Sequence, residues 1–255
     1  MKKSILFLFC FVLYLNNLFS NDLYNRYQHI FIEEIEPYKR IGIKYAYKDN
    51  LQKEDPEKEQ NFILFGEYQF FTFYSLYIHI PYTIHWVEGS ENRKYLDHFR
   101  ILNKFQIDKN YYKFYVGLKL DLPRNHDKAG DVPSDVGYIE PYIGFGIFMI
   151  PFMMKFSIHW NTQSNTKFKE ERDQQFERKW IYNLSMGLIY QNWQFWLETQ
   201  YQYLYDPKDK KTNIFFIGPS LGYKWNNLNI SLIYIFPSNE YKYNKEILLQ
   251  FQKIF

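Results

Sequence analysis

Apolar and polar residues alternate along most of this chain after residue 37. Between residues 76 and 86 the even positions carry Leu, Ile, Ile, Tyr, Ile and Trp, and the odd positions carry Tyr, His, Pro, Thr and His. Residues 112–122 and 152–161 repeat this alternation. Because successive side chains of a β-strand point to opposite faces, a period of two predicts strands that each have one apolar and one polar face.

Twelve segments of this kind follow one another, and each is near the roughly 9 to 11 residues that a tilted strand needs to cross a bilayer. Long charged connections take turns with very short ones, as in outer-membrane barrels, whose short turns are periplasmic and whose longer loops lie outside. The sequence therefore predicts an all-β fold, a transmembrane antiparallel up-and-down β-barrel of about 12 strands, within a range of about 10 to 14. We expect strands at residues 39–48, 61–71, 74–87, 95–107, 111–122, 137–149, 152–162, 176–190, 193–204, 213–225, 227–236 and 246–255.

The tryptophans test this prediction independently, because Trp on a lipid-facing surface gathers at the two membrane interfaces. A large soluble barrel or sandwich would also alternate, but its aromatic residues would have no reason to mark two planes. Five of the six tryptophans are expected at strand ends and one inside the barrel. We place Trp86, Trp160 and Trp180 at the outer ends, Trp193 and Trp225 at the short turns, and Trp196 inside.

The N-terminal region predicts export. Residues 1–20 contain two lysines, an apolar run from Ile5 to Leu15 and a short polar stretch that closes on Ser20. This is the layout of a signal peptide, and the run is shorter than the roughly 20 residues of a membrane-spanning helix. We expect cleavage after Ser20, a periplasmic extension at residues 21–37 and a barrel at residues 38–255.

Charge and cysteine content exclude several classes of site. Removing Lys2 and Lys3 with the signal peptide would lower the formal net charge from +3 to +1, and the basic residues form no block or stripe that would suit nucleic acid. The single cysteine, Cys10, would leave with the signal peptide. Disulfides and thiolate metal sites are therefore excluded, and we expect no cofactor and no metal.

The end of the chain carries a strand pattern that terminates on an aromatic residue. Ile247, Leu249, Phe251 and the terminal Phe255 alternate with mostly polar positions. This segment resembles the last strand of bacterial outer-membrane β-barrel proteins of the porin-like kind. The resemblance implies an outer-membrane location, contact with the lipid bilayer, and an assembly signal at Phe251 and Phe255 that is read by the barrel-assembly machinery.

The polar face of the strands is the place to look for function, because the fold alone does not supply one. Bases outnumber acids on this face, so we predict a narrow pore for small hydrophilic solutes with a weak preference for anions. A basic ring of Lys104, Lys113 and Lys224 is expected near the periplasmic mouth. The residues predicted to line the pore are Lys44, Glu67, Arg100, Lys104, Lys113, Lys119, Glu140, Lys155, Glu198 and Lys224.

Three other interpretations stay open. The inner charges could pair with one another in a closed structural barrel, because an unpaired charge out of water is costly. The charged outer loops could capture a ligand or act in adhesion. A hydrolase is the weakest alternative, because Ser157 and His159 are about 7 Å apart by strand rise and a nucleophile needs its base within about 2.6 to 3.2 Å. We therefore predict that the protein is not an enzyme and assign no catalytic residue.

Overall fold

The computed structural model describes the barrel but not the segments before it and between some strands. The described residues are 39–50, 57–87, 92–96, 99–109, 111–122, 136–149, 151–165, 178–205, 211–237 and 245–255. The predicted signal peptide at residues 1–20 and the predicted extension at residues 21–37 lie outside these ranges. Within the described residues, no helix is long and apolar enough to cross a membrane.

All regular structure in the described residues is β-strand, and the strands form one sheet. Short strand β4 and strand β5 both pair with β3, so they occupy one position in the barrel wall, which has twelve positions. The strands are β1 (Arg40–Asn50), β2 (Glu57–Phe71), β3 (Tyr74–Val87), β4 (Arg93–Leu96), β5 (Phe99–Lys109), β6 (Tyr112–Leu122), β7 (Val136–Met149), β8 (Phe152–Asn165), β9 (Arg178–Tyr190), β10 (Trp193–Tyr205), β11 (Lys211–Trp225), β12 (Leu228–Pro237) and β13 (Lys245–Ile254).

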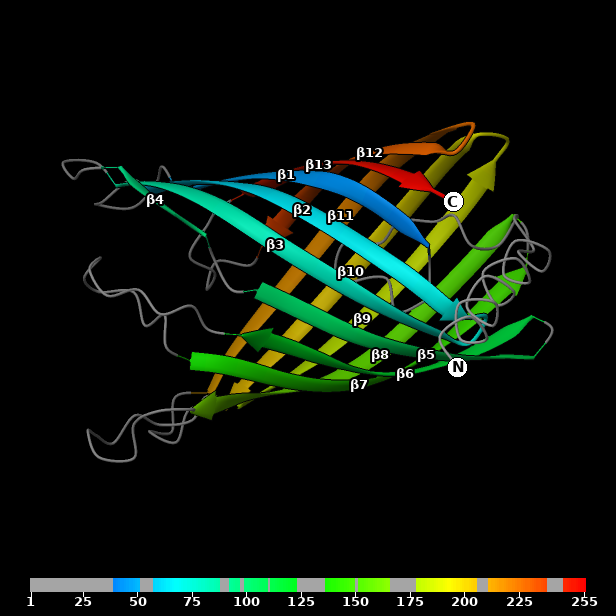
Figure 1. Cartoon of the computed structure of the whole chain (residues 1–255), viewed down its shortest axis with the longest axis horizontal. Coiled ribbons are helices and arrows are strands. Elements are labelled where there is room, and N and C mark those ends of the chain that lie inside the picture. The colour runs from blue at the N-terminus through cyan, green and yellow to red at the C-terminus, as the bar shows by residue number, and fades with distance from the viewer. Residues whose placement is uncertain are drawn as a thin grey trace, which may run out of the picture.

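The sheet closes on itself. Apart from β4 and β5, which both pair with β3, each strand pairs antiparallel with its neighbour in the chain, and β1 also pairs with β13 from Arg40↔Ile254 to Asp49↔Lys245. Figure 1 shows β1 and β13 side by side at the top of the tilted barrel. The predicted fold and the even number of wall positions are thus confirmed, and the last ten residues form a strand because they complete the barrel.

Most predicted strand ends differ from the observed ones by no more than three residues, and two strand predictions needed a larger correction. Strand β2 begins at Glu57 rather than at residue 61, because the polar residues 57–60 continue the ladder between β1 and β3 without any apolar alternation to reveal them. The predicted strand at 95–107 is divided into β4 and β5. Both errors lie at the loop ends of the strands, beyond the apolar outer surface, where apolar and polar residues no longer alternate and the pattern cannot mark the strand.

The outer surface of the barrel is apolar. Large hydrophobic side chains are exposed on almost every strand, among them Ile43, Val116, Phe156, Leu188 and Leu232. Trp160 and Trp180 stack on each other near one end with ring centroids 6.1 Å apart, and Trp193 and Trp225 lie exposed at the short turns of the other end. This distribution is that of a barrel that spans a lipid bilayer.

The short turns join strands at one end, and the longer connections lie at the other. Tyr190 pairs with Trp193 across the two-residue turn Gln191-Asn192, and Trp225 pairs with Leu228 across Asn226-Asn227. Gln191 and Asn226 adopt positive φ angles of 54° and 52°, as tight hairpin turns require at their first central residue. We call the two halves of the barrel the turn-side half and the loop-side half.

We predict that deletion of Phe255 lowers the amount of folded barrel. The Phe255 backbone N–H donates to the Lys39 carbonyl oxygen at 3.0 Å, and its ring is exposed on the outer face beside the seam between β1 and β13. Loss of this residue removes both the last hydrogen bond of the closing ladder and the predicted assembly signal. Heat-modifiable protein in outer-membrane fractions should fall while export continues, and unchanged folded levels would contradict the assigned role of Phe255.

Candidate functional site

A polar cavity of about 370 Å³ occupies the loop-side half of the barrel interior. Its lining comes from the inner faces of six consecutive strands, β5 to β10, each at the end nearest the loops. Solvent reaches the side chains of Arg100 and Lys119, which are 23% and 14% exposed. The lining residues are Arg100, Lys119, Asp121, Tyr138, Glu140, His159, Asn161, Lys179, Ile181, Asn183, Gln200 and Gln202.

One wall of this cavity is a network of charges. Arg100 Nε donates to Asp121 Oδ1 at 2.6 Å across the β5–β6 pair. Lys119 Nζ lies 3.5 Å from each oxygen of Glu140 and 4.0 Å from Asp121 Oδ2. Each carboxylate that lines the cavity is therefore compensated by a base on a neighbouring strand, as buried charges require.

Glu140 also anchors a chain of hydrogen bonds. Asn161 Nδ2 donates to Glu140 Oε2 at 2.6 Å, and His159 Nδ1 lies 2.9 Å from Glu140 Oε1. Because a carboxylate only accepts, Nδ1 must carry the proton, which in the neutral ring leaves Nε2 as an acceptor. The Ser157 hydroxyl, 2.8 Å from Nε2, then donates to the ring.

Amide side chains on the neighbouring strands β9 and β10 extend this chain in the same direction. Asn183 Nδ2 donates to Ser157 Oγ at 3.1 Å, and Gln200 Nε2 donates to Asn183 Oδ1 at 2.8 Å. Gln202 Nε2 donates in turn to Gln200 Oε1. In each hydrogen bond of this chain, the donor belongs to the residue farther from Glu140 and the acceptor to the residue nearer to it. The orientation of each amide is therefore fixed by its neighbour.

Ser157 and His159 are within hydrogen-bond distance, so the prediction that strand rise keeps their side chains apart is wrong. Strand rise separates the Cα atoms of Ser157 and His159, but their side chains lean together and bring Oγ to 2.8 Å from Nε2. Glu140 on β7 lies 2.9 Å from His159 Nδ1 and is the third member of this arrangement. However, Ser157 is completely buried and does not line the cavity, so the arrangement serves as a link in the polar chain.

The turn-side half holds a second charged cluster around Glu67. Arg40 Nη2 and Lys104 Nζ approach Glu67 Oε2 at 2.8 and 2.9 Å, and the Ser75 hydroxyl donates to Oε1 at 2.5 Å. The side chains of Arg40, Glu67 and Lys104 are at most 1% exposed. Lys104 is thus committed to a buried ion pair.

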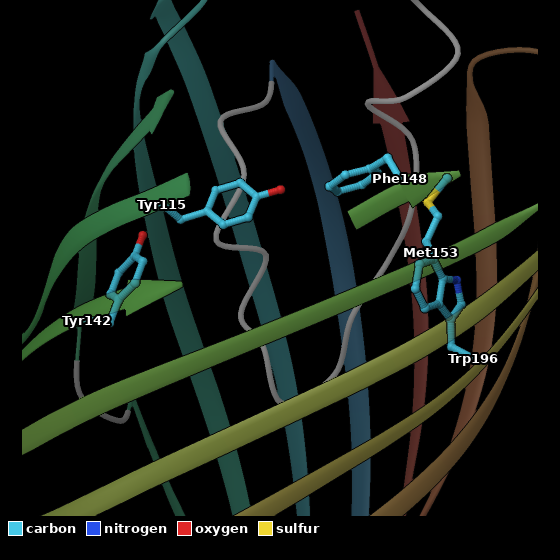
Figure 2. Packing of buried hydrophobic residues seen from close by; sticks show 5 residues of the cluster. All are labelled: Tyr115, Tyr142, Phe148, Met153 and Trp196. Carbon is cyan, nitrogen blue, oxygen red and sulfur yellow. The ribbon is translucent and has the colours of Figure 1, made fainter. Parts of the chain in front are cut away.

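Aromatic side chains fill much of the space around these charges. Figure 2 shows Phe148, Met153 and Trp196 side by side inside the barrel, with Tyr115 and Tyr142 farther along the same cluster. Lys113 Nζ and Lys155 Nζ lie 4.8 and 5.3 Å from the centre of the Phe148 ring, which is within the range of cation–π attraction. The prediction that Trp196 points inward is confirmed, because only 4% of this residue is exposed.

Two glycines allow the largest rings to lie flat against the wall. A Cβ atom on Gly187 would lie 2.2 Å from the Trp196 ring, and one on Gly117 would lie 2.3 Å from the Tyr142 ring. Each ring faces its glycine directly across a strand pair. Any larger residue at either position would push the ring farther into the lumen.

The structure places all ten predicted pore-lining residues on the face of their strands that points inward. Seven are buried, and Arg100, Lys119 and Lys224 are half-buried. Arg100, Lys119 and Glu140 are brought together at the loop-side cavity, while Glu67 and Lys104 meet in the turn-side cluster. Lys104 is paired with Glu67, and the basic ring of Lys104, Lys113 and Lys224 remains a prediction.

Arg40, Asn183 and Gln202 were not predicted from the sequence as functional residues. Arg40 shares the inner face of β1 with Lys44, and Asn183 shares the inner face of β9 with Lys179. The alternation along each strand is sufficient to place Arg40 and Asn183 on the inner face of the barrel. Nothing in the sequence, however, indicated that Arg40 would bond Glu67 or that Asn183 would bond Ser157, because these contacts join different strands.

The fold resembles solved structures of outer-membrane channels and porins. An outer membrane channel from Pseudomonas putida F1 aligns with a TM-score of 0.64 at 11% sequence identity, and the alignment covers 92% of this chain and 99% of that chain. The NanC porin aligns with a TM-score of 0.56 at 9% identity, covering 84% of this chain and 98% of that chain. The KdgM porin aligns with a TM-score of 0.52 at 12% identity, covering 84% and 99%. No protein-family model and no curated protein matches this chain.

We predict that Glu67→Gln strongly destabilises the barrel. The substitution leaves Arg40 and Lys104 buried beside a neutral amide, and removing one partner of a buried ion pair costs about 3 to 5 kcal/mol. Unfolding by urea in lipid vesicles, followed by tryptophan fluorescence, measures the loss. The matched control is Glu246→Gln, at a half-buried position near the loops, and equal effects of the two substitutions would contradict the importance of the Glu67 cluster.

Proposed function

We propose that this barrel lies in the outer membrane and forms a narrow pore for small hydrophilic solutes, with a weak preference for anions. The observation that carries the proposal is the polar cavity, which opens to solvent at the loop-side half of a closed barrel with an apolar outer surface. The likeness to channel and porin structures supports the fold on which the proposal rests.

The packing of the turn-side half sets the expected width of the path. Lys104, Lys155, Tyr115 and Phe148 are each at most 1% exposed, so this level is the constriction. A path through it is lined by lysines over aromatic rings, which favours small solutes and excludes large ones. Bases that face inward outnumber acids, and Arg40 adds to this excess.

Hydrolysis is not part of the proposal. Ser157 is 0% exposed and His159 is 5% exposed, and the cavity lining includes His159 but not Ser157. A substrate in the cavity therefore has no contact with the hydroxyl that would have to attack it. We propose a non-enzymatic role for the Ser157–His159–Glu140 link.

A closed barrel is the second candidate, and the same packed level favours it. With the constriction fully closed, the loop-side cavity would act as a binding pocket that faces the cell exterior. Single-channel conductance of refolded protein in a planar bilayer separates the two candidates. Stepwise current supports the pore, whereas folded protein that passes no current at any salt concentration favours the closed barrel.

We expect Phe148→Ala to raise single-channel conductance. The substitution removes a fully buried ring from the constriction, so the cross-section available to ions increases while the wall is unchanged. The control is Phe145→Ala on the same strand, where the ring packs against Phe114 on the outer face. Unchanged conductance in Phe148→Ala, with normal folding, would show that the conducting path avoids this level.

We expect the double variant Lys113→Glu and Lys224→Glu to move the reversal potential toward cations. Fixed positive charge raises the local concentration of anions, and its reach shrinks from about 30 Å at 0.01 M salt to about 10 Å at 0.1 M. Lys104 is kept because its substitution would disrupt the Glu67 cluster. The shift should therefore be larger at low salt.

The matched control makes the same change in charge on the outer face, with Lys109→Glu and Lys253→Glu, both exposed at the turn end of their strands. A reversal potential that moves equally in the control and in the lumen variant would contradict a selectivity set inside the barrel.

A further inference from the structure

The charges that line the loop-side cavity indicate which class of solute the cavity would bind. Its described lining contains three cationic side chains, Arg100, Lys119 and Lys179, and two anionic ones, Asp121 and Glu140. These five charged side chains sum to a net charge of +1. A single negative charge on a solute would balance it.

The acids in this lining are already engaged by protein donors. Both oxygens of Asp121 accept from Arg100, at 2.6 and 3.3 Å. Both oxygens of Glu140 are also engaged: Oε1 by His159, Oε2 by Asn161, and each of them by Lys119 at 3.5 Å. An anionic solute therefore meets carboxylates whose charge is compensated, which lowers the repulsion it would otherwise experience.

The amide wall offers a solute both donors and acceptors. In the directed chain from Gln202 to Glu140, the carbonyl oxygens of Asn183 and Gln200 each accept a hydrogen bond from the next amide. An amide nitrogen carries two N–H groups, and each of Asn161, Asn183, Gln200 and Gln202 uses one of them in this chain. These bonds hold each amide side chain in place, and they therefore also fix the direction of its second N–H group.

We propose that this cavity binds a small monoanion that carries a carboxylate and several hydroxyl groups. The carboxylate would balance the +1 charge of the lining, and its oxygens, which only accept, match the cationic side chains there. The hydroxyl groups, which both donate and accept, match the amide wall. The volume of about 370 Å³ is at the lower end of the roughly 300 to 1,000 Å³ of small-molecule pockets. The inference names the solute class of the proposed pore, and its role in transport rests on that function.

The test compares two probes that differ only in the charged group. Gluconate and sorbitol have the same six-carbon chain and similar hydroxyls, but only gluconate carries a carboxylate. Isothermal titration calorimetry of the refolded full-length barrel in detergent at low salt should give binding of gluconate at least about tenfold tighter than that of sorbitol, because a charge in a partly desolvated site is worth more than a hydroxyl.

Two matched variants locate the site. Gln202→Glu replaces a donor in the cavity with a negative charge and should weaken gluconate binding at least about fivefold. Gln69→Glu makes the same change at the turn end of β2, where Gln69 donates to the Thr72 carbonyl oxygen, and should leave binding unchanged. Heat-modifiability on gels verifies that both variants fold.

Three outcomes would overturn the inference. They are no heat of binding at millimolar gluconate, equal binding of gluconate and sorbitol, and gluconate binding that survives Gln202→Glu. Conductance in a planar bilayer then separates this inference from the pore. Gluconate binding by a barrel that passes no current keeps the binding site and overturns the pore, whereas current without gluconate binding does the reverse.

Discussion

The structure depends on the requirement that every backbone N–H and C=O group inside a bilayer finds a partner within the protein. Lipid offers no hydrogen bonds, and each unsatisfied group costs several kcal/mol, so a sheet that spans the membrane must close. Here the seam is the ladder from Arg40↔Ile254 to Asp49↔Lys245. Closure explains why the final residues of the chain are a paired strand and why Phe255 donates to Lys39.

Closure also creates an interior that must accommodate every side chain on the polar face. Water reaches this space poorly at the turn-side level, so charges there are paired or lie over aromatic rings. Glu67 has Arg40, Lys104 and Ser75 around it, and Lys155 lies between the rings of Phe148 and Trp196 at 5.3 and 5.9 Å. The same contacts that satisfy these charges narrow the lumen. In the proposed pore, one group of residues would therefore set both the stability of the barrel and the size of the solute that passes.

The loop-side half is packed less tightly than the turn-side half, because its polar side chains line a cavity. Its carboxylates are compensated by Arg100 and Lys119, and its amides form a chain whose direction is fixed at Glu140. Such a wall is organised before any solute arrives, which reduces the cost of ordering side chains on binding. In the proposed pore, a solute would be held in the organised polar cavity before it reaches the packed level.

The sequence by itself determined the barrel, the direction of each face and the positions of the short turns. These features follow from local rules: alternation with period two, loop length, and the tendency of Trp to lie at interfaces. It also placed Glu67, Lys104, Glu140 and His159 inside, because inward and outward positions are fixed by even or odd numbering along each strand.

Only the tertiary structure decided which of these residues meet. Arg40 and Glu67 are 27 residues apart, and Glu140 and His159 are 19 residues apart, yet each pair is within hydrogen-bond distance. Such contacts depend on strand register and on how far each side chain leans, and neither is encoded in the period of the pattern. For that reason strand rise gave about 7 Å for Ser157 and His159, while their side-chain atoms lie 2.8 Å apart. Alternation fixes the face on which a residue lies, and register with side-chain reach fixes its partner.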